Sequence, residues 1–260
     1  MARIRNPFRR APLLHVAADR GSGPVVVLLH GIASSSVTFE NVIPLLEPAH
    51  RVIAVDLLGF GESPAPPDAE YTLGEHAACV ARTLRSLGIR GPVALVGHSM
   101  GALIATRFAA RYRGRVGKLV LVSPPIYLSP TAIGNPRDRT EMDLYLRVYQ
   151  FFRENKEFTI GAAAQLGRLL PIKRQLDVSE RNWRAFVLSL ERSIEEQTTL
   201  SDLAAIRVPV EIVYGTLDPL LVPSGIRVAE QLRGVTSHRV NGGDHVIRPR
   251  MARVVATAVG

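Results

Sequence analysis

Short apolar stretches rich in β-branched residues alternate along the chain with longer amphipathic stretches, and this alternation is what most restricts the fold. The apolar stretches have the length of strands and include Val25–Leu29, Arg51–Asp56, Pro92–Val96, Lys118–Val122 and Val210–Tyr214. Between them, apolar residues recur at helical spacing, as from Leu73 to Leu87. Continuous apolar strands separated by amphipathic helices predict an α/β fold of three layers, with helices on both faces of a mostly parallel sheet.

The alternation is interrupted between Pro124 and Asp202. This interval has helical patterns over 141–153, 158–170 and 179–197 and holds a large share of the aromatic residues. We interpret residues 125–202 as a helical cap inserted between two strands of a core, which residues 1–124 and 203–260 form. Most of the aromatic side chains are expected to pack the cap onto the core, and a few to line a pocket.

The sequence Gly97-His98-Ser99-Met100-Gly101 lies between an apolar strand and an Ala-rich helix. In that context it matches the pattern G-x-S-x-G, a sharp turn that exposes the serine hydroxyl at the edge of a sheet. The two glycines are needed because a Cβ at either position would meet the adjoining strand and helix. Ser99 is therefore the candidate nucleophile.

A serine hydroxyl needs a general base, and the order serine, acid, histidine places that base late in the chain. Of the seven histidines, His245 fits best, because it follows the last predicted strand in a loop with two glycines. His238 lies within a predicted strand and is interpreted as structural or exposed. His245 is therefore the candidate base.

The acid that orients the base is expected just after the preceding strand, where Asp218 lies in the stretch Tyr214–Pro219. Asp244 is the rival, but a carboxylate cannot easily face the ring of the next residue, so we interpret it as a turn residue. Asp202 lies too early, before the strand. Asp218 is therefore the candidate acid.

An oxyanion formed on the substrate needs two N–H donors. The N–H group of Met100, directly after the nucleophile, is one candidate. The loop His30-Gly31-Ile32-Ala33 follows the first central strand, which makes the N–H group of Ile32 the second. His30, Gly31, Gly97, His98 and Gly101 are then supporting residues of the site.

The stretch from Asp56 to Ser63 contains Gly59-x-Gly61, which superficially resembles a dinucleotide-binding loop. No third glycine follows at the required spacing, and prolines replace the helix that such a loop opens. We therefore expect neither a cofactor nor a metal ion.

The formal net charge is +9, and the basic residues are spread along the chain except in the first ten residues. There Arg3, Arg5, Arg9 and Arg10 stand with no acid among them. We interpret this segment as a solvated terminus, and the alternative is weak contact with an anionic membrane surface. A small-molecule substrate is expected, with no nucleic-acid partner.

The single cysteine, Cys79, allows no internal disulfide and is expected to be a buried thiol. No apolar stretch is long enough for a secretory signal or a membrane span. These features predict a soluble, cytoplasmic protein.

Together the stretches His30-Gly31, Asp56–Ser63, Gly97–Gly101, Tyr214–Asp218 and His245 resemble the α/β-hydrolase superfamily. The resemblance is to the branch of esterases, lactonases, cofactor-free haloperoxidases and meta-cleavage product hydrolases. It implies an eight-stranded, mostly parallel sheet with the cap entering after strand six. Only Leu13–Ala17 marks the N-terminal hairpin convincingly, so a seven-stranded sheet is the alternative. Serine at position 99 disfavours the haloalkane dehalogenases and most epoxide hydrolases of this fold, which carry aspartate there.

Three functions follow as alternatives. The first is hydrolysis of a carboxylic ester, or a related acyl bond, of a small apolar substrate through an acyl-enzyme. The second is cleavage of a carbon–carbon bond in a diketone acid, which would use cationic residues of the cap to hold the carboxylate. The candidates for that role are Arg147, Arg153, Arg168, Arg174, Arg181, Arg184 and Arg192. The third is a binding protein that keeps the fold and turns over little.

Overall fold

The computed structural model describes residues 10–128, 136–170, 172 and 175–260, leaving out the side chains of 137–139 and 141–142. Its sheet is mostly parallel and has the order β1-β3-β2-β4-β5-β6-β7, with β1 alone antiparallel to its neighbour. The strands are β1 Val16–Arg20, β2 Val25–Leu29, β3 Arg51–Val55, β4 Val93–His98, β5 Val116–Val122, β6 Val210–Gly215 and β7 Val235–Val240.

The described residues therefore form seven strands, so the seven-stranded alternative is confirmed and the eight-stranded count is not met. The N-terminal strand lies slightly later than the apolar pattern suggested, at Val16–Arg20 instead of Leu13–Ala17. β1 is itself an edge strand that pairs only with β3, and its residues are half-buried or exposed.

Side chains of the central strands are divided between two apolar clusters. Val27 and Leu29 belong to one cluster, whereas Val26 and Leu28 belong to the other. Successive residues of a strand point to opposite faces of the sheet, so a continuous apolar run is what a sheet buried on both faces requires. The predicted three-layer architecture is confirmed.

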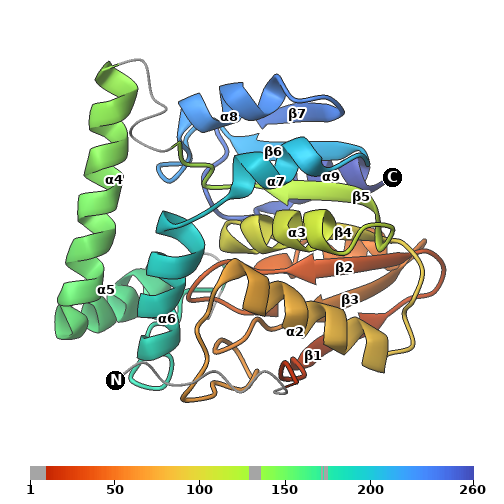
Figure 1. Cartoon of the computed structure of the whole chain (residues 1–260), viewed down its shortest axis with the longest axis horizontal. Helices are drawn as coiled ribbons and strands as arrows, with labels where there is room; N and C mark the ends of the chain where they lie inside the picture. The colour runs from red at the N-terminus through yellow and green to blue at the C-terminus, as the bar shows by residue number, and fades with distance from the viewer. Residues whose placement is uncertain (1–9, 129–135, 171, 173–174) are drawn as a thin grey trace.

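Helices cover the two faces of the sheet (Figure 1). One apolar cluster joins the sheet to α2 and α3, while the other joins it to α1 and α9. The core helices are α1 Ile43–Leu46, α2 Leu73–Ser86, α3 Met100–Arg111, α7 Thr199–Ala205, α8 Pro223–Glu230 and α9 Pro249–Val259, with a short 3₁₀ turn η1 at Ser36–Phe39. α2 begins at Leu73, as the sequence predicted, and the Thr72 side chain caps it by accepting a hydrogen bond from the N–H group of Glu75.

The segment between β5 and β6 is helical where it is described. It contains α4 Pro136–Glu154, α5 Lys156–Leu169, α6 Trp183–Ser189 and the π-helical turn η3 Leu190–Glu195. In Figure 1, α4 and α5 stand at the outer edge of the molecule, and α6 lies between α5 and the core. The single helix expected over 179–197 is wrong, because it begins only at Trp183 and widens into a π turn whose residue Ser193 donates to the Tyr71 carbonyl.

Candidate active site

Ser99 occupies the turn between β4 and α3, with φ 53° and ψ −124°. A residue with a side chain rarely adopts such a conformation, which costs about 1–3 kcal/mol and persists only where the surrounding structure imposes it. The N–H group of Ser99 donates to the carbonyl of Val122 at the end of β5, over 2.9 Å. The predicted sharp turn is thus present at the carboxyl ends of the central strands, where α/β sheets place their ligand sites.

The glycines around Ser99 are required by close backbone contacts. A Cβ on Gly97 would lie 2.3 Å from the carbonyl oxygen of Gly101, and a Cβ on Gly101 would lie 2.2 Å from that of Leu29. A Cβ on Gly31 would lie 3.0 Å from the Cβ of Ser99 and 3.5 Å from its hydroxyl. The loop after β2 therefore packs directly against the serine.

Asp218 and His245 form the central polar pair of the site. Nδ1 of His245 lies 3.0 Å and 2.9 Å from the two carboxylate oxygens of Asp218. The Asp218 side chain is fully buried, at 0% exposure, whereas that of His245 is 21% exposed. A carboxylate can only accept, so Nδ1 carries the proton, and Nε2 of the neutral ring is left free to accept another.

Several groups keep the Asp218 carboxylate charged. Burial raises the pKa of Asp218, but the hydrogen bond and charge of His245, the N–H group of Leu220 and the Ser123 hydroxyl outweigh burial and leave the pKa below its ordinary value. The N–H group of Leu220 donates to the Asp218 carboxylate over 2.9 Å. A charged, buried carboxylate aimed at Nδ1 is the arrangement that orients a catalytic histidine.

His98, next to the nucleophile, holds the loop that carries His245. Its Nε2 lies 2.8 Å from the backbone oxygen of His245, and the two rings are 4.8 Å apart. Burial above all, and then the neighbouring His245, lower the pKa of His98 to about 3, so the ring is neutral and donates through Nε2–H. The sequence indicated only a supporting role for His98, and this contact shows that it supports the loop of His245.

The contact of His98 with His245, and that of His245 with Asp218, thus bring Ser99, His245 and Asp218 together at the carboxyl ends of the strands. Among the described residues, no hydrogen bond joins the Ser99 hydroxyl to His245. Nucleophile–base contacts of this kind are often long until substrate binds.

His30 shapes the loop that carries Ile32. Its Nδ1 lies 2.7 Å from the carbonyl of Gly31, and its Nε2 accepts from the N–H group of Leu57 over 2.8 Å. Burial lowers the pKa of His30 to about 4, which keeps the ring neutral and this pair of bonds intact. In the described part of the chain, the N–H groups of Ile32 and Met100 have no hydrogen-bond partner, so both are free to donate to a ligand.

Two contacts from the helical insertion reach the site, and sequence reasoning missed both. The N–H group of Asp177 donates to the Ala33 carbonyl over 2.7 Å, next to Ile32. The hydroxyl of Tyr145, on α4, donates to the Pro219 carbonyl over 2.5 Å, next to Asp218. The concentration of aromatic residues in the insertion was the available signal, but it does not say which of them reaches the acid loop.

Two other histidines, and the rival acid Asp244, are placed in structural contacts. His15 bonds to Asp56 over 2.9 Å, and His238 bonds to Glu211 over 2.8 Å. Asp244 forms an ion pair with Arg248 at 2.7 Å.

Three of the seven cap arginines considered as carboxylate ligands form ion pairs with acidic side chains. Arg153 lies 3.1 Å from Glu195, Arg181 lies 3.7 Å from Asp177, and Arg192 pairs with Glu70. Arg174 lies outside the described residues.

No group of three or more potential metal-ligating side chains is found in the residues that the structure describes. Across the same residues, no helix combines the length and apolar character needed to cross a membrane.

Comparison with known protein families gives a match to the α/β-hydrolase fold family over residues 24–199. This chain belongs to that family. The match begins just before β2 and includes the nucleophile turn, so the elements that carry Ile32 and Ser99 fall inside it. The α/β-hydrolase fold expected from the sequence is confirmed.

Two curated relatives resemble this α/β-hydrolase over part of its length. A probable lysophospholipase of Arabidopsis thaliana, BODYGUARD 3, is 40% identical over 43% of this chain and 23% of its own length. The 2-(acetamidomethylene)succinate hydrolase of Mesorhizobium japonicum is 36% identical over 44% of this chain and 41% of its own length. The matched part thus spans between about a quarter and two fifths of these relatives.

Among solved structures, an esterase from Exiguobacterium antarcticum superposes on this α/β-hydrolase with a TM-score of 0.76. The alignment covers 95% of both chains at 22% identity. At that identity, the similarity is one of fold.

Proposed function

We propose that this chain is a serine hydrolase that cleaves a carboxylic ester of a small apolar substrate through an acyl-enzyme. Ser99 is the nucleophile, His245 the general base and Asp218 the acid that orients it. The observation that carries the proposal is the 2.9 Å contact between His245 Nδ1 and the buried Asp218 carboxylate, beside a serine held at positive φ.

The steps follow from the positions of these groups. The Ser99 oxygen attacks the ester carbonyl while its proton moves to Nε2 of His245, which forms a tetrahedral oxyanion. When the bond to the alcohol oxygen breaks, His245 returns that proton to the alcohol and leaves an acyl group on Ser99. Water then repeats the sequence and releases the acid.

The free N–H groups of Ile32 and Met100 are proposed to hold the oxyanion. Each such donor is worth about 2.7–4 kcal/mol of barrier lowering, because it points at charge that develops only in the transition state. His30 supports this role, since it fixes the carbonyl of Gly31 and so the direction of the next amide.

The ester class is supported by the curated relatives, which include a probable lysophospholipase. A hydrolase acting on 2-(acetamidomethylene)succinate, an acyl compound that is not an ester, also matches the chain. The acyl bond is therefore the common element of the proposal.

Labelling with a fluorophosphonate tests the nucleophile directly. We expect one adduct on the peptide that contains Ser99, no adduct in Ser99→Ala, and hydrolysis of short p-nitrophenyl esters that falls at least about a thousandfold in that variant. An adduct on another serine, or full ester turnover by Ser99→Ala, would reject the assignment. Turnover of a ring-fission diketone acid without ester turnover would favour the carbon–carbon hydrolase instead.

A further inference from the structure

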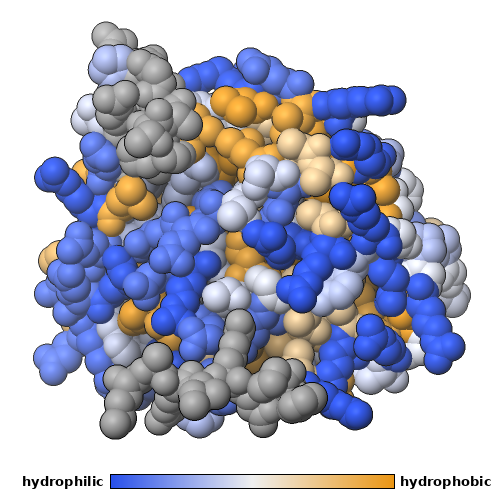
Figure 2. All heavy atoms as spheres, in the orientation of Figure 1, coloured by the Kyte–Doolittle hydropathy of each residue, from blue (hydrophilic) through white to orange (hydrophobic). Residues whose placement is uncertain are grey.

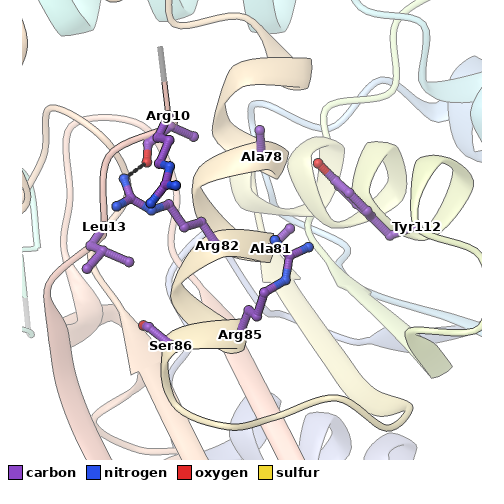
Figure 3. Close-up of a pocket in the computed structure, with 9 residues that line it drawn as sticks. Arg10, Leu13, Ala78, Ala81, Arg82, Arg85, Ser86 and Tyr112 are labelled. Carbon is purple, nitrogen blue, oxygen red and sulfur yellow. Dashed lines mark hydrogen bonds between the residues drawn. The ribbon is translucent and has the colours of Figure 1, made fainter. Parts of the chain in front are cut away.

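A groove lies on the outer side of α2, away from the proposed active site. It has a volume of about 570 Å³ and is bounded by residues 10–13, the second half of α2 and Tyr112 at the end of α3. Figure 3 shows that Arg10, Arg82 and Arg85 contribute their guanidinium groups to it, while Leu13, Ala78 and Ala81 supply apolar surface. The groove therefore combines positive charge with an apolar floor.

The charge of this groove is not neutralised by the protein. Arg82 donates to the backbone carbonyl of Ala11, and among the described residues none of the three arginines forms an ion pair with a carboxylate. Guanidinium groups gathered in this way repel one another, and an anion between them would remove that repulsion. The groove is thus suited to a negatively charged ligand.

The sequence around these arginines adds to the positive charge of the groove. The residues that line the groove come from two parts of the sequence, positions 1 to 18 and 76 to 137, neither of which contains an Asp or Glu. Between 76 and 137 there are nine basic residues, and between 1 and 18 there are four. The second stretch includes most of α2 and all of α3, which cover one face of the sheet. In Figure 2 hydrophilic side chains alternate with apolar ones over this face.

We propose that this groove, defined by Arg10, Leu13, Arg82, Arg85 and Tyr112, docks the protein on the phosphate head groups of an anionic lipid membrane. The groove is open to solvent, and Leu13 at its rim is 45% exposed, so a flat bilayer surface can approach and accept an apolar side chain. A nucleic acid would supply phosphates for the arginines, but it has no apolar layer that could accept the Leu13 side chain. The inference is independent of the proposed catalytic activity.

Sedimentation with lipid vesicles tests the proposal on the full chain. We expect binding to vesicles of phosphatidylcholine with phosphatidylglycerol, little binding to phosphatidylcholine alone, and a loss of binding as salt is raised.

The decisive variant is Arg10→Gln/Arg85→Gln, because both side chains are exposed and form no hydrogen bond among the described residues. Each arginine near an anionic surface contributes about a fivefold gain in binding, so the double variant should bind about 25-fold more weakly. The control Arg233→Gln/Arg250→Gln removes the same charge from exposed positions elsewhere and should bind within about threefold of the parent. Equal losses in both pairs would overturn the proposal, because they would show a response to net charge alone.

Leu13→Ser separates the lipid from other anions. It should weaken vesicle binding while leaving the thermal midpoint unchanged, since the side chain is exposed. If the protein instead binds single-stranded RNA more tightly than the anionic vesicles, and Leu13→Ser has no effect on either, the membrane assignment is wrong.

Discussion

His98 Nε2 donates to the backbone oxygen of His245 over 2.8 Å, so the residue before the proposed nucleophile holds the loop that carries the proposed base. The two residues are 147 positions apart in the chain. This contact fixes the distance between the nucleophile turn and the last loop of the core. It makes His98 a positioning residue, which acts through His245.

We expect His98→Ala to lower kcat for p-nitrophenyl esters by up to about a hundredfold, because a base displaced by about 1 Å loses its alignment. KM should change little. His98→Gln, whose amide keeps an N–H donor, should recover part of kcat. Steady-state kinetics of both variants tests this, and a loss confined to KM would show that His98 contacts substrate instead.

Asp218→Asn should lower kcat about ten-thousandfold, because an amide no longer holds the proton of His245 on Nδ1. Asp244→Asn is the matched control, since Asp244 pairs with the exposed Arg248 on the surface. A surface ion pair contributes about 0–1 kcal/mol, so this control should keep nearly full activity. The comparison of kcat for the two variants checks the choice between these acids, and the reverse result would assign Asp244.

Gly101→Ala should destabilise the fold by at least about 3 kcal/mol, because the new Cβ would lie 2.2 Å from the Leu29 carbonyl oxygen, which is held in the sheet. Gly161→Ala lies on the exposed side of α5 with nothing within 4 Å of the new Cβ. It should stabilise the protein by about 0.5–1 kcal/mol. Urea unfolding measures both changes, and a tolerated Gly101→Ala would contradict the tight packing of the nucleophile turn.

The buried histidines predict a loss of stability in acid. Burial lowers the pKa of His76 and His98 to about 3 and that of His30 to about 4, whereas the unfolded chain binds these protons near 6.5. The unfolded state therefore binds more protons as the pH falls from 6.5 towards 3. Each ring then costs about 1.4 kcal/mol of folding free energy per pH unit.

His76 isolates this effect, because neither of its ring nitrogens has a hydrogen-bond partner among the described residues. We expect His76→Leu to be more stable than the parent in acid, with an advantage that grows by about 1.4 kcal/mol per pH unit below 6.5. Denaturant unfolding between pH 5 and pH 7 measures the difference, and an advantage independent of pH would mean that the pKa of His76 is the same in the folded and unfolded protein.

The sequence by itself determined the fold and the candidate residues. Continuous apolar strands between amphipathic helices specify a parallel sheet covered on both faces. The need for Gly97 is local, because a Cβ there would meet the Gly101 carbonyl within the same turn, whereas Gly101 is required by its contact with the distant Leu29 carbonyl. The order of Ser99, Asp218 and His245 along the chain could also be recognised in the sequence. The strand count was not, because a short edge strand that pairs on one side carries little apolar periodicity.

Only the tertiary structure decided which distant groups meet. It placed His98 on the loop of His245, Tyr145 on the loop of Asp218, and Asp177 on the loop of Ile32. In each of these contacts the acceptor is a backbone carbonyl. Every residue has one, so the residue type does not reveal which carbonyl will accept a hydrogen bond. The groove beside α2 arises in the same way, because two basic stretches become one charged surface only after the chain has folded.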